Sequence, residues 1–321
     1  MILVTGGAGY IGGVCAERLL GRGYDVCVLD NLSRGYRDAV PSGADFVKAD
    51  LSDREALAAV FRDKPIKAVM HFAAYALVGE SMQQPNLYFR NNFSNAVNLL
   101  EATVDAGVDR FIFSSTCAIF GDKAPPPIPE DAPKNPINPY GESKLAFEKA
   151  LGWSRRIHGL NYFALRYFNA CGATADRGER HDPETHLIPL VLQAAAGERD
   201  AIKVFGTDYP TPDGTCIRDY IHVLDLADAH IVALEAPAEK SGPYNLGVGR
   251  GDSVKQVIET ARRITGREIP VVEAPRRPGD PPELVADPTK IRRELGWQAQ
   301  HDLESCVSSA WKFFQRSRGQ G

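Results

Sequence analysis

The sequence contains no hydrophobic run long enough to span a bilayer and no basic, apolar leader before its first motif. A membrane-spanning helix needs ~18 or more apolar residues, and an export signal needs both of those leader features. Lysine and arginine are dispersed and the net charge is only -4, so no basic stripe is present to attract nucleic acid or an anionic membrane. We therefore expect no nucleic-acid partner, no membrane association and no export.

Paired cysteines are also lacking. The chain has six cysteines, but they show neither CxxC pairs nor the paired Cys/His spacing of a zinc site. The chain is too long to depend on a small disulfide framework. We expect no metal site and a reducing compartment, the cytoplasm. The cysteines are Cys15, Cys27, Cys117, Cys171, Cys216 and Cys306.

Strand and helix patterns alternate through the first half of the chain. Its 321 residues, 44% of them hydrophobic, allow one large domain or two smaller ones. The alternation predicts an α/β fold, a Rossmann-type doubly wound parallel sheet over 1–172, followed by a smaller domain over 173–321 that returns some segments to the first. The predicted strands are 2–4, 24–29, 45–48, 68–72 and 111–113, and the predicted helices are 53–61, 85–107, 187–196 and 253–265.

A glycine-rich turn joins the first strand to a helix. Gly6 suits the tight turn, Gly9 allows a ligand to approach the backbone, and Gly12 allows the helix to pack closely. The spacing is GxxGxxG rather than GxGxxG. Free amides at the start of this helix, around Tyr10 and Ile11, can hold a pyrophosphate. The turn therefore predicts a dinucleotide site.

Acidic residues follow the next two strands. Asp30 lies 18 residues after Gly12, where a carboxylate binds a ribose diol and repels a 2′-phosphate, so NAD is favoured over NADP. Nearby Arg34 and Arg37 keep NADP open. Asn31 follows Asp30, and Asp50 with Leu51 follows the third strand. Asp50 is predicted either to reach the adenine or to cap the next helix.

Later strands carry polar residues toward the same sheet edge. The fourth strand leads into Phe72 and Ala73, and its His71 is interpreted as a packed core histidine. On the helix over 85–107, Asn91 or its neighbour Asn92 either binds across to the site or belongs to a polar face. The fifth strand ends at Thr116, whose hydroxyl can reach a substrate oxygen.

A tyrosine and a lysine stand four residues apart at the start of another helix. Asn138 can cap this helix and Pro139 suits its first position, so Tyr140 and Lys144 share one face. A phenol must lose ~3 pKa units from ~10 to act as a base at neutral pH. A lysine ammonium and the positive end of the helix both lower the phenol pKa. Taken alone, this short motif is weak.

These motifs occur together in a recognisable order. TGGAGYIG, LDN, HFAA, FSSTCAIFGD and PYGESK resemble the extended short-chain dehydrogenase/reductase family. The later motifs RYFN, FGTDYPTPDGT, RDYIHV and APRRPGD resemble the UDP-glucose 4-epimerase family, over nearly the whole chain.

The resemblance implies a reversible reaction on UDP-galactose and UDP-glucose. In that reaction Tyr140 takes the proton of the sugar 4-hydroxyl while hydride passes to NAD, and hydride then returns to the other face of the keto sugar. Lys144 lowers the Tyr140 pKa and holds the nicotinamide ribose, and Thr116 is the assisting hydroxyl. Dehydratases of the superfamily carry an Asp-Glu pair directly after this threonine, whereas this chain has Cys117 and Ala118. Cys117 is interpreted as a small buried residue.

The resemblance also implies the other site residues. Arg218 and Arg277 are expected at the pyrophosphate, Phe205 at the uracil and Asp280 at a ribose hydroxyl. Asn169 is expected at a phosphate or hydroxyl of the substrate. The remaining cofactor contact is Phe168.

Two positions differ from some family members. Ala76 replaces a lysine near the cofactor phosphates, and Leu284 replaces a bulky tyrosine in the sugar pocket. The smaller Leu284 predicts acceptance of UDP-N-acetylhexosamines. The resemblance also implies a homodimer through the helices that begin at Pro85 and Pro139. A UDP-pentose or UDP-uronate 4-epimerase, a plain dehydrogenase and a noncatalytic nucleotide sensor remain as alternatives.

Overall fold

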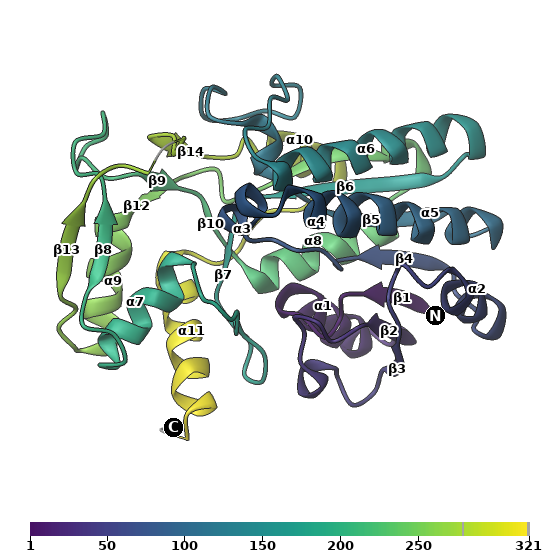
Figure 1. The fold of residues 1–321 in the computed structure, drawn as a ribbon, viewed down its shortest axis with the longest axis horizontal. Coiled ribbons are helices and arrows are strands. Elements are labelled where there is room, and N and C mark those ends of the chain that lie inside the picture. The colour runs from purple at the N-terminus through teal and green to yellow at the C-terminus, as the bar shows by residue number, and fades with distance from the viewer. Residues whose placement is uncertain (278, 320–321) are drawn as a thin grey trace.

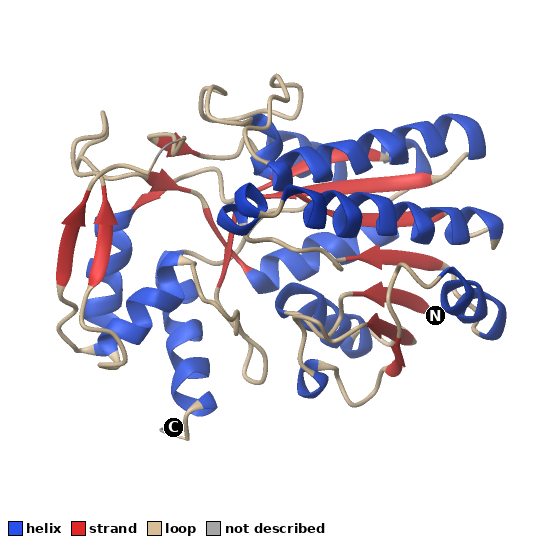
Figure 2. Ribbon diagram, viewed as in Figure 1, coloured by secondary structure: helices blue, strands red, loops and turns tan. Residues whose placement is uncertain are grey.

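A seven-stranded parallel sheet forms the core of the larger region, on the right in Figure 2, where all strands are red. The computed structural model describes residues 1–277 and 279–319. The spatial order of the strands is β11-β6-β5-β4-β1-β2-β3, and every neighbouring pair is parallel. The strands are β1 Ile2–Thr5, β2 Val26–Asp30, β3 Asp45–Lys48, β4 Ala68–His71, β5 Arg110–Thr116, β6 Asn161–Tyr167 and β11 Gly242–Leu246.

Both faces of this sheet are covered, because its central strands are apolar on alternate sides. In β1, Ile2 and Val4 join one buried cluster while Leu3 joins the other. Helices lie on each side (Figure 2). The first layer contains α1 Tyr10–Gly21, α8 Val223–Glu235 and α10 Thr289–Leu295, and the second contains α2 Arg54–Asp63, α5 Asn95–Asp105 and α6 Pro139–His158.

The helix predicted over 85–107 is interrupted. It is built from α4 Pro85–Tyr88, a π-helical turn over Phe89–Ser94, and α5. A shorter helix, α3 Val78–Gln83, precedes it and was not predicted. The prediction of one regular α-helix was therefore wrong in its middle, where a wider turn accommodates an extra residue per turn. Short 3₁₀ turns cover Arg37–Ala39, Cys117–Phe120 and Ala238–Lys240.

The second half of the chain builds a smaller region, on the left in Figure 1, around its own buried cluster. Its strands pair as β13 with β8, β10 with β7, and β12 and β14 with β9. The helices are α7 Leu187–Ala195, α9 Val254–Thr265 and α11 Leu303–Ser317. The strands are β7 Asn169–Cys171, β8 Ile202–Phe205, β9 Ile217–Arg218, β10 Tyr220–His222, β12 Asp252–Ser253, β13 Val271–Ala274 and β14 Glu283–Leu284.

The architecture confirms the predicted Rossmann-type fold class. Strand β11 and helices α8 and α10 come from the second half of the chain yet pack in the large sheet and its helical layer. The boundary at residue 172 stays a prediction, and residues 320 and 321 lie outside the described part of the chain. None of the described helices combines the length and the apolar character needed to cross a membrane.

Candidate active site

The glycine turn has the geometry that a nucleotide pyrophosphate requires. Gly6 has φ +76°, and a Cβ there would lie 2.5 Å from the Ala73 amide nitrogen, so only glycine fits. A Cβ at Gly12 would collide with the Gly6 carbonyl group. Helix α1 begins after Gly9 without a side-chain cap, which leaves its first amides for a ligand. These residues fit a dinucleotide.

Asp30 ends β2 at the carboxyl edge of the sheet. Its carboxylate accepts hydrogen bonds from the Ala8 amide at 3.0 Å and the Leu32 amide at 2.8 Å. Burial raises its pKa, and these amide donors act in the opposite sense. The Asp30 carboxylate is therefore fixed beside the glycine turn, in the position that a ribose diol needs.

The Asp50 side chain also faces this edge. It accepts a hydrogen bond from the Asn31 side-chain amide at 2.6 Å. The alternative that Asp50 caps the next helix was wrong, because Asp53 caps α2 by accepting from the Ala56 amide at 3.0 Å.

Two nearby arginines are engaged elsewhere. Arg34 pairs with Glu80 at 2.6 Å, and the guanidinium of Arg37 lies 4.4 Å from the Phe46 ring centre. Neither arginine neutralises the Asp30 carboxylate, so its negative charge would repel a 2′-phosphate. The arrangement therefore favours a cofactor with a free 2′-hydroxyl.

Helix α6 positions the tyrosine and lysine as predicted. It begins at Pro139, and the Asn138 side chain accepts a hydrogen bond from the Gly141 amide at 2.8 Å. Lys144 is buried and donates to the Ser114 carbonyl at the end of β5, at 2.8 Å. Tyr140 and Lys144 line the same cavity as the glycine turn.

The predicted lowering of the Tyr140 pKa was wrong. Burial raises the pKa of Tyr140 to about 12, although the Thr116 hydroxyl acts in the lowering direction. Burial also lowers the pKa of Lys144 to about 7, against the attraction of Glu148. The reason for the error is that both groups are desolvated, so the lysine is a weaker cation than the motif suggested.

Thr116 lies at the end of β5 and caps the turn that follows. Its hydroxyl oxygen accepts a hydrogen bond from the Ala118 amide at 3.1 Å. Cys117 and Ala118 both line the cavity beside it. The interpretation of Cys117 as a buried residue was therefore incomplete, because it is partly exposed to the cavity, while burial raises its pKa to about 12. The thiol is protonated at neutral pH.

His71 is a packed core residue, as predicted. It is 1% exposed, and its Nδ1 lies 2.7 Å from the Thr5 hydroxyl. Burial lowers its pKa to about 3, so the ring is neutral at physiological pH. His71 braces β1 against β4 below the site.

An asparagine in the π-helical turn braces the site from behind. Asn92 accepts from the Tyr75 amide at 2.8 Å and donates to the Tyr75 carbonyl at 2.9 Å. It also donates to the Ser143 hydroxyl of α6 at 3.3 Å. Asn91, the predicted cofactor contact, lines the cavity and donates to Asn92 at 3.0 Å.

The residues expected at the substrate nucleotide contact one another. Arg218 forms an ion pair with Asp280, and the guanidinium of Arg277 lies 4.0 Å from the centre of the Phe205 ring. The sequence analysis assigned both arginines to the pyrophosphate, Phe205 to the uracil and Asp280 to a ribose hydroxyl, and did not anticipate that each arginine contacts one of the other two residues. Pro278, in the same motif, lies outside the described residues.

One cavity of about 1640 Å³ contains every residue that the sequence analysis assigned to the site. A typical small-molecule pocket has ~300–1,000 Å³, so this volume suits a dinucleotide and a second ligand together. On the cofactor side the lining includes Gly6, Gly9, Tyr10, Ile11, Gly12, Asp30, Asn31, Asp50, Leu51, Phe72, Ala73, Asn91 and Phe168. On the other side it includes Thr116, Tyr140, Lys144, Asn169, Phe205, Arg218, Arg277, Asp280 and Leu284, and the variable Ala76 also lines it.

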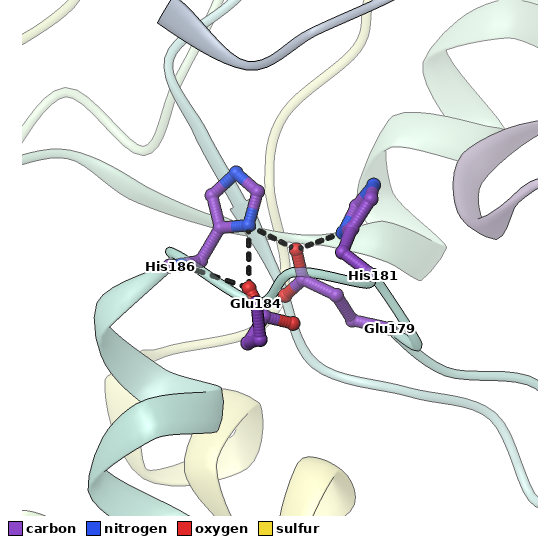
Figure 3. A group of neighbouring side chains, drawn as sticks. All are labelled: Glu179, His181, Glu184 and His186. Atoms are coloured by element: carbon purple, nitrogen blue, oxygen red, sulfur yellow. Dashed lines mark hydrogen bonds and ion pairs between the residues drawn. The ribbon is translucent and has the colours of Figure 1, made fainter. Parts of the chain in front are cut away.

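Sequence reasoning missed two features of the site. The Ser114 carbonyl that receives Lys144 is a backbone group, which no residue pattern identifies. A group of two glutamates and two histidines also lines the cavity, in the loop before α7 (Figure 3). Its spacing, Glu-x-His-x-x-Glu-x-His over 179–186, was available in the sequence.

Comparisons with known proteins agree with this geometry. The model of the NAD dependent epimerase/dehydratase family matches residues 2–247. UDP-glucose 4-epimerase of Streptomyces lividans is 50% identical over 97% of this chain and 95% of its own. The structure of Brucella ovis UDP-glucose 4-epimerase in complex with NAD is 47% identical, with a TM-score of 0.94 over 98% of each chain.

A third protein, the UDP-Glc/GlcNAc 4-epimerase of Campylobacter jejuni, is 42% identical in its solved structure. Its TM-score is 0.87, over 98% of this chain and 99% of that one. Because the family model covers well over half of the residues, and the similarity to these relatives extends along nearly the whole length, this chain belongs to the NAD dependent epimerase/dehydratase family.

Proposed function

We propose that this chain catalyses the reversible 4-epimerisation of UDP-galactose and UDP-glucose with a retained NAD. One observation carries the proposal: Tyr140, Lys144 and Thr116 line the same cavity as the glycine turn, and no carboxylate stands at positions 117 and 118. Elimination needs a further acid or base beside the threonine, whereas epimerisation at C4 does not.

NAD, when bound, supplies the acceptor and donor of the hydride at the sugar C4. The glycine turn holds its pyrophosphate through the amides of α1, and Asp30 holds its adenine ribose. Lys144, anchored to the Ser114 carbonyl, holds the nicotinamide ribose. The cavity of about 1640 Å³ has room for the sugar to turn over.

Tyr140 is the proton acceptor and donor. Its phenolate takes the proton of the sugar 4-hydroxyl, and the same oxygen returns a proton when the product forms. Burial raises the pKa of Tyr140 to about 12. The positive charge of a bound nicotinamide would lower that pKa, as any neighbouring cation does. Thr116 holds the 4-hydroxyl by a hydrogen bond.

The UDP group occupies the other part of the cavity. Its two phosphate charges attract Arg218 and Arg277, and the uracil packs on the Phe205 ring, which lies 4.0 Å from the Arg277 guanidinium. Asp280 passes from its ion pair with Arg218 to a ribose hydroxyl, and Asn169 binds a neighbouring oxygen. Binding therefore replaces the Arg218–Asp280 ion pair and the Arg277–Phe205 contact with contacts to the nucleotide.

The test is an assay of purified protein with UDP-galactose and no added NAD. We expect UDP-glucose to form, and we expect Tyr140→Phe to lose at least a hundredfold in kcat, the range of general acid-base catalysis. Absence of conversion with every UDP-hexose, UDP-N-acetylhexosamine, UDP-pentose and UDP-uronate would overturn the proposal and leave the nucleotide sensor. Stoichiometric release of NADH would indicate the plain dehydrogenase. Full activity of Tyr140→Phe would reject the assigned base alone.

A second substrate class, the UDP-N-acetylhexosamines, is favoured by Leu284. This residue lies on β14 and lines the cavity with a smaller side chain than tyrosine. The Campylobacter jejuni relative is named as a UDP-Glc/GlcNAc epimerase.

We further propose that the active molecule is a cytoplasmic homodimer. Helix α6 exposes two large apolar side chains one turn apart, Trp153 at 59% and Ile157 at 68%. The cytoplasm is supported by the six cysteines, all of which are unpaired thiols.

A further inference from the structure

The loop between β7 and α7 gathers four potential metal ligands. Glu179, His181, Glu184 and His186 each offer one ligand atom, and these atoms all lie within 4.8 Å of one another. Figure 3 shows that the four side chains form a row of contacts, in which Glu179 lies between the two imidazole rings and Glu184 contacts His186. All four come from one stretch of eight residues, which brings them together without a long-range fold contact.

The Nδ1 atoms of the two rings face the carboxylates. His186 Nδ1 lies 2.6 Å from Glu179 Oε1 and 3.0 Å from Glu184 Oε1. His181 Nδ1 lies 3.0 Å from Glu179 Oε1 (Figure 3). The candidate ligand atoms are therefore two histidine nitrogens and two carboxylate oxygens.

The two carboxylates are buried and need a compensating positive charge. The side chains of Glu179 and Glu184 are 9% and 8% exposed. A buried charge is costly unless it is paired or binds a metal. The loop has two arginines, but Arg177 pairs with Glu17 and Arg180 pairs with Asp38, outside the group. The Thr185 and His186 amides donate hydrogen bonds to the Glu184 carboxylate at 2.7 and 2.8 Å, and the histidines or a bound cation supply the positive charge.

We propose that Glu179, His181, Glu184 and His186 bind one divalent transition-metal cation, with Zn²⁺ as the best match. Zn²⁺ takes histidine nitrogen and glutamate oxygen in a tetrahedral site with bonds of ~2.0–2.2 Å, which places neighbouring donors ~3.3 Å apart. Three of the donor pairs are now 2.6 to 3.0 Å apart and would move slightly outward to reach that spacing, and all donors already lie within 4.8 Å of one another. The mixed donor set disfavours Mg²⁺ and Ca²⁺, which prefer oxygen alone.

Protons are the competitors for this site. Burial lowers the pKa of His186, but the Glu179 and Glu184 carboxylates outweigh it and raise the pKa to about 10. A metal ion replaces the proton on each ligating imidazole nitrogen, and that proton leaves to solvent. The experiment therefore has to distinguish a His186 ring that keeps its proton from a His186 ring that binds a metal.

The position of the loop gives the metal a structural role beside the cofactor cavity. The four residues line that cavity together with Tyr10, whose hydroxyl donates to the Gly172 carbonyl at 2.5 Å, at the start of the same loop. Burial and then the Glu179 charge raise the pKa of Tyr10, which places this carboxylate close to the glycine turn. A bound metal holds the loop closed there without entering the proton chemistry of Tyr140.

The experiment uses the full chain, stripped with EDTA, returned to metal-free buffer and titrated with ZnCl₂ by calorimetry. We expect one Zn²⁺ per chain and a Tm that rises on Zn²⁺ addition. The double variant His181→Ala/His186→Ala should bind Zn²⁺ at least a hundredfold more weakly and show no Zn²⁺-dependent rise in Tm. Co²⁺ in place of Zn²⁺ should give the visible absorption of a tetrahedral site in the wild type only.

The matched control is His158→Ala, which removes an exposed histidine at the end of α6. It should bind Zn²⁺ as the wild type does. Glu184→Gln keeps the shape of the group and removes one charged ligand, so it tests the site if the double variant fails to fold. Equal Zn²⁺ affinity in the wild type, the double variant and Glu184→Gln would show that Zn²⁺ binds elsewhere, and no Zn²⁺ uptake by the wild type would show that the group binds no metal; either result would overturn the proposal.

Discussion

At the scale of single residues, Leu284 determines how much room the sugar has. It lies opposite Arg218 in the β14-β9 pair and presents an aliphatic side chain to the cavity. A tyrosine there would fill space that a 2-acetamido group needs. We expect Leu284→Tyr to reduce kcat/KM for UDP-N-acetylglucosamine at least tenfold while that for UDP-galactose changes less than threefold, within the range that one pocket group contributes.

The measurement is kcat/KM for both substrates in the same preparation. Leu284→Met, which keeps an aliphatic side chain, is the control and should leave the ratio unchanged. If the tyrosine variant lost both activities to the same extent, the substitution would have damaged the cavity as a whole and the size argument would fail.

Single residues also show what a sequence motif conveys and what it omits. The positions of Tyr140 and Lys144 on one helical face followed from Asn138, Pro139 and the four-residue spacing. Their protonation did not follow, because the pKa of each depends on burial by segments far away in the chain. The same is true of Arg218 and Asp280, which lie 62 residues apart and form a pair that only tertiary contact creates.

At the scale of elements, the π-helical turn over Phe89–Ser94 supports the backbone that lines the cofactor cavity. Asn92 satisfies both backbone groups of Tyr75 from within this turn. Asn92→Ala leaves those two half-buried groups without partners, at ~1–3 kcal/mol for a fully buried group. Because the groups are only half-buried, we expect a loss of about 2 kcal/mol in the free energy of unfolding, and less NAD retained through purification.

Urea unfolding and the NAD content of the purified protein test this expectation. Asn86→Ala is the control, since Asn86 is exposed on α4 of the same helical stretch. A full complement of NAD and an unchanged urea midpoint in Asn92→Ala would exclude the bracing role. The turn itself was not predictable, because the apolar spacing from Leu87 to Val104 fits a regular α-helix and the insertion depends on the partner at Tyr75.

Elements of the sheet were more predictable than the site that they carry. Runs such as Ile2-Leu3-Val4 and Phe111-Ile112-Phe113 are apolar on both sides, which central parallel strands require. The position of β11 at the edge of the sheet, beside β6, could not be predicted from the residues of β11 themselves. Its residues lie 75 or more positions beyond β6 and join the sheet only because α8 and α10 pack on the same face as α1.

At the scale of the whole molecule, three buried histidines link stability to pH. Burial lowers the pKa of His71 to about 3 and those of His222 and His230 to about 4. The unfolded chain therefore binds more protons than the folded one between pH 6.5 and 4, and stability falls as pH falls through this window. Asp219, with a pKa raised to about 6 by burial, opposes this below pH 6.

Three histidines against one aspartate leave a net difference of about two protons, or on the order of 2–3 kcal/mol per pH unit near pH 5. Urea unfolding at pH 7.0 and 5.0, at constant NAD, measures the slope. His230→Gln removes one of the three titrations and should reduce the slope by about a third to a half. Equal stability at both pH values would contradict the assignment of neutral, buried rings.

The exposed side of α6 either faces solvent in a monomer or is buried between two copies of the chain. Trp153 and Ile157 expose large apolar areas on a helix that otherwise packs against the sheet. We expect light scattering to give the mass of two chains for the wild type and of one chain for Trp153→Glu/Ile157→Glu, because the charges cannot be buried. Val272→Glu, at a 51% exposed position on β13, is the control and should stay dimeric. A wild type that remains a monomer at micromolar concentration would assign the exposed pair to the surface of a monomer.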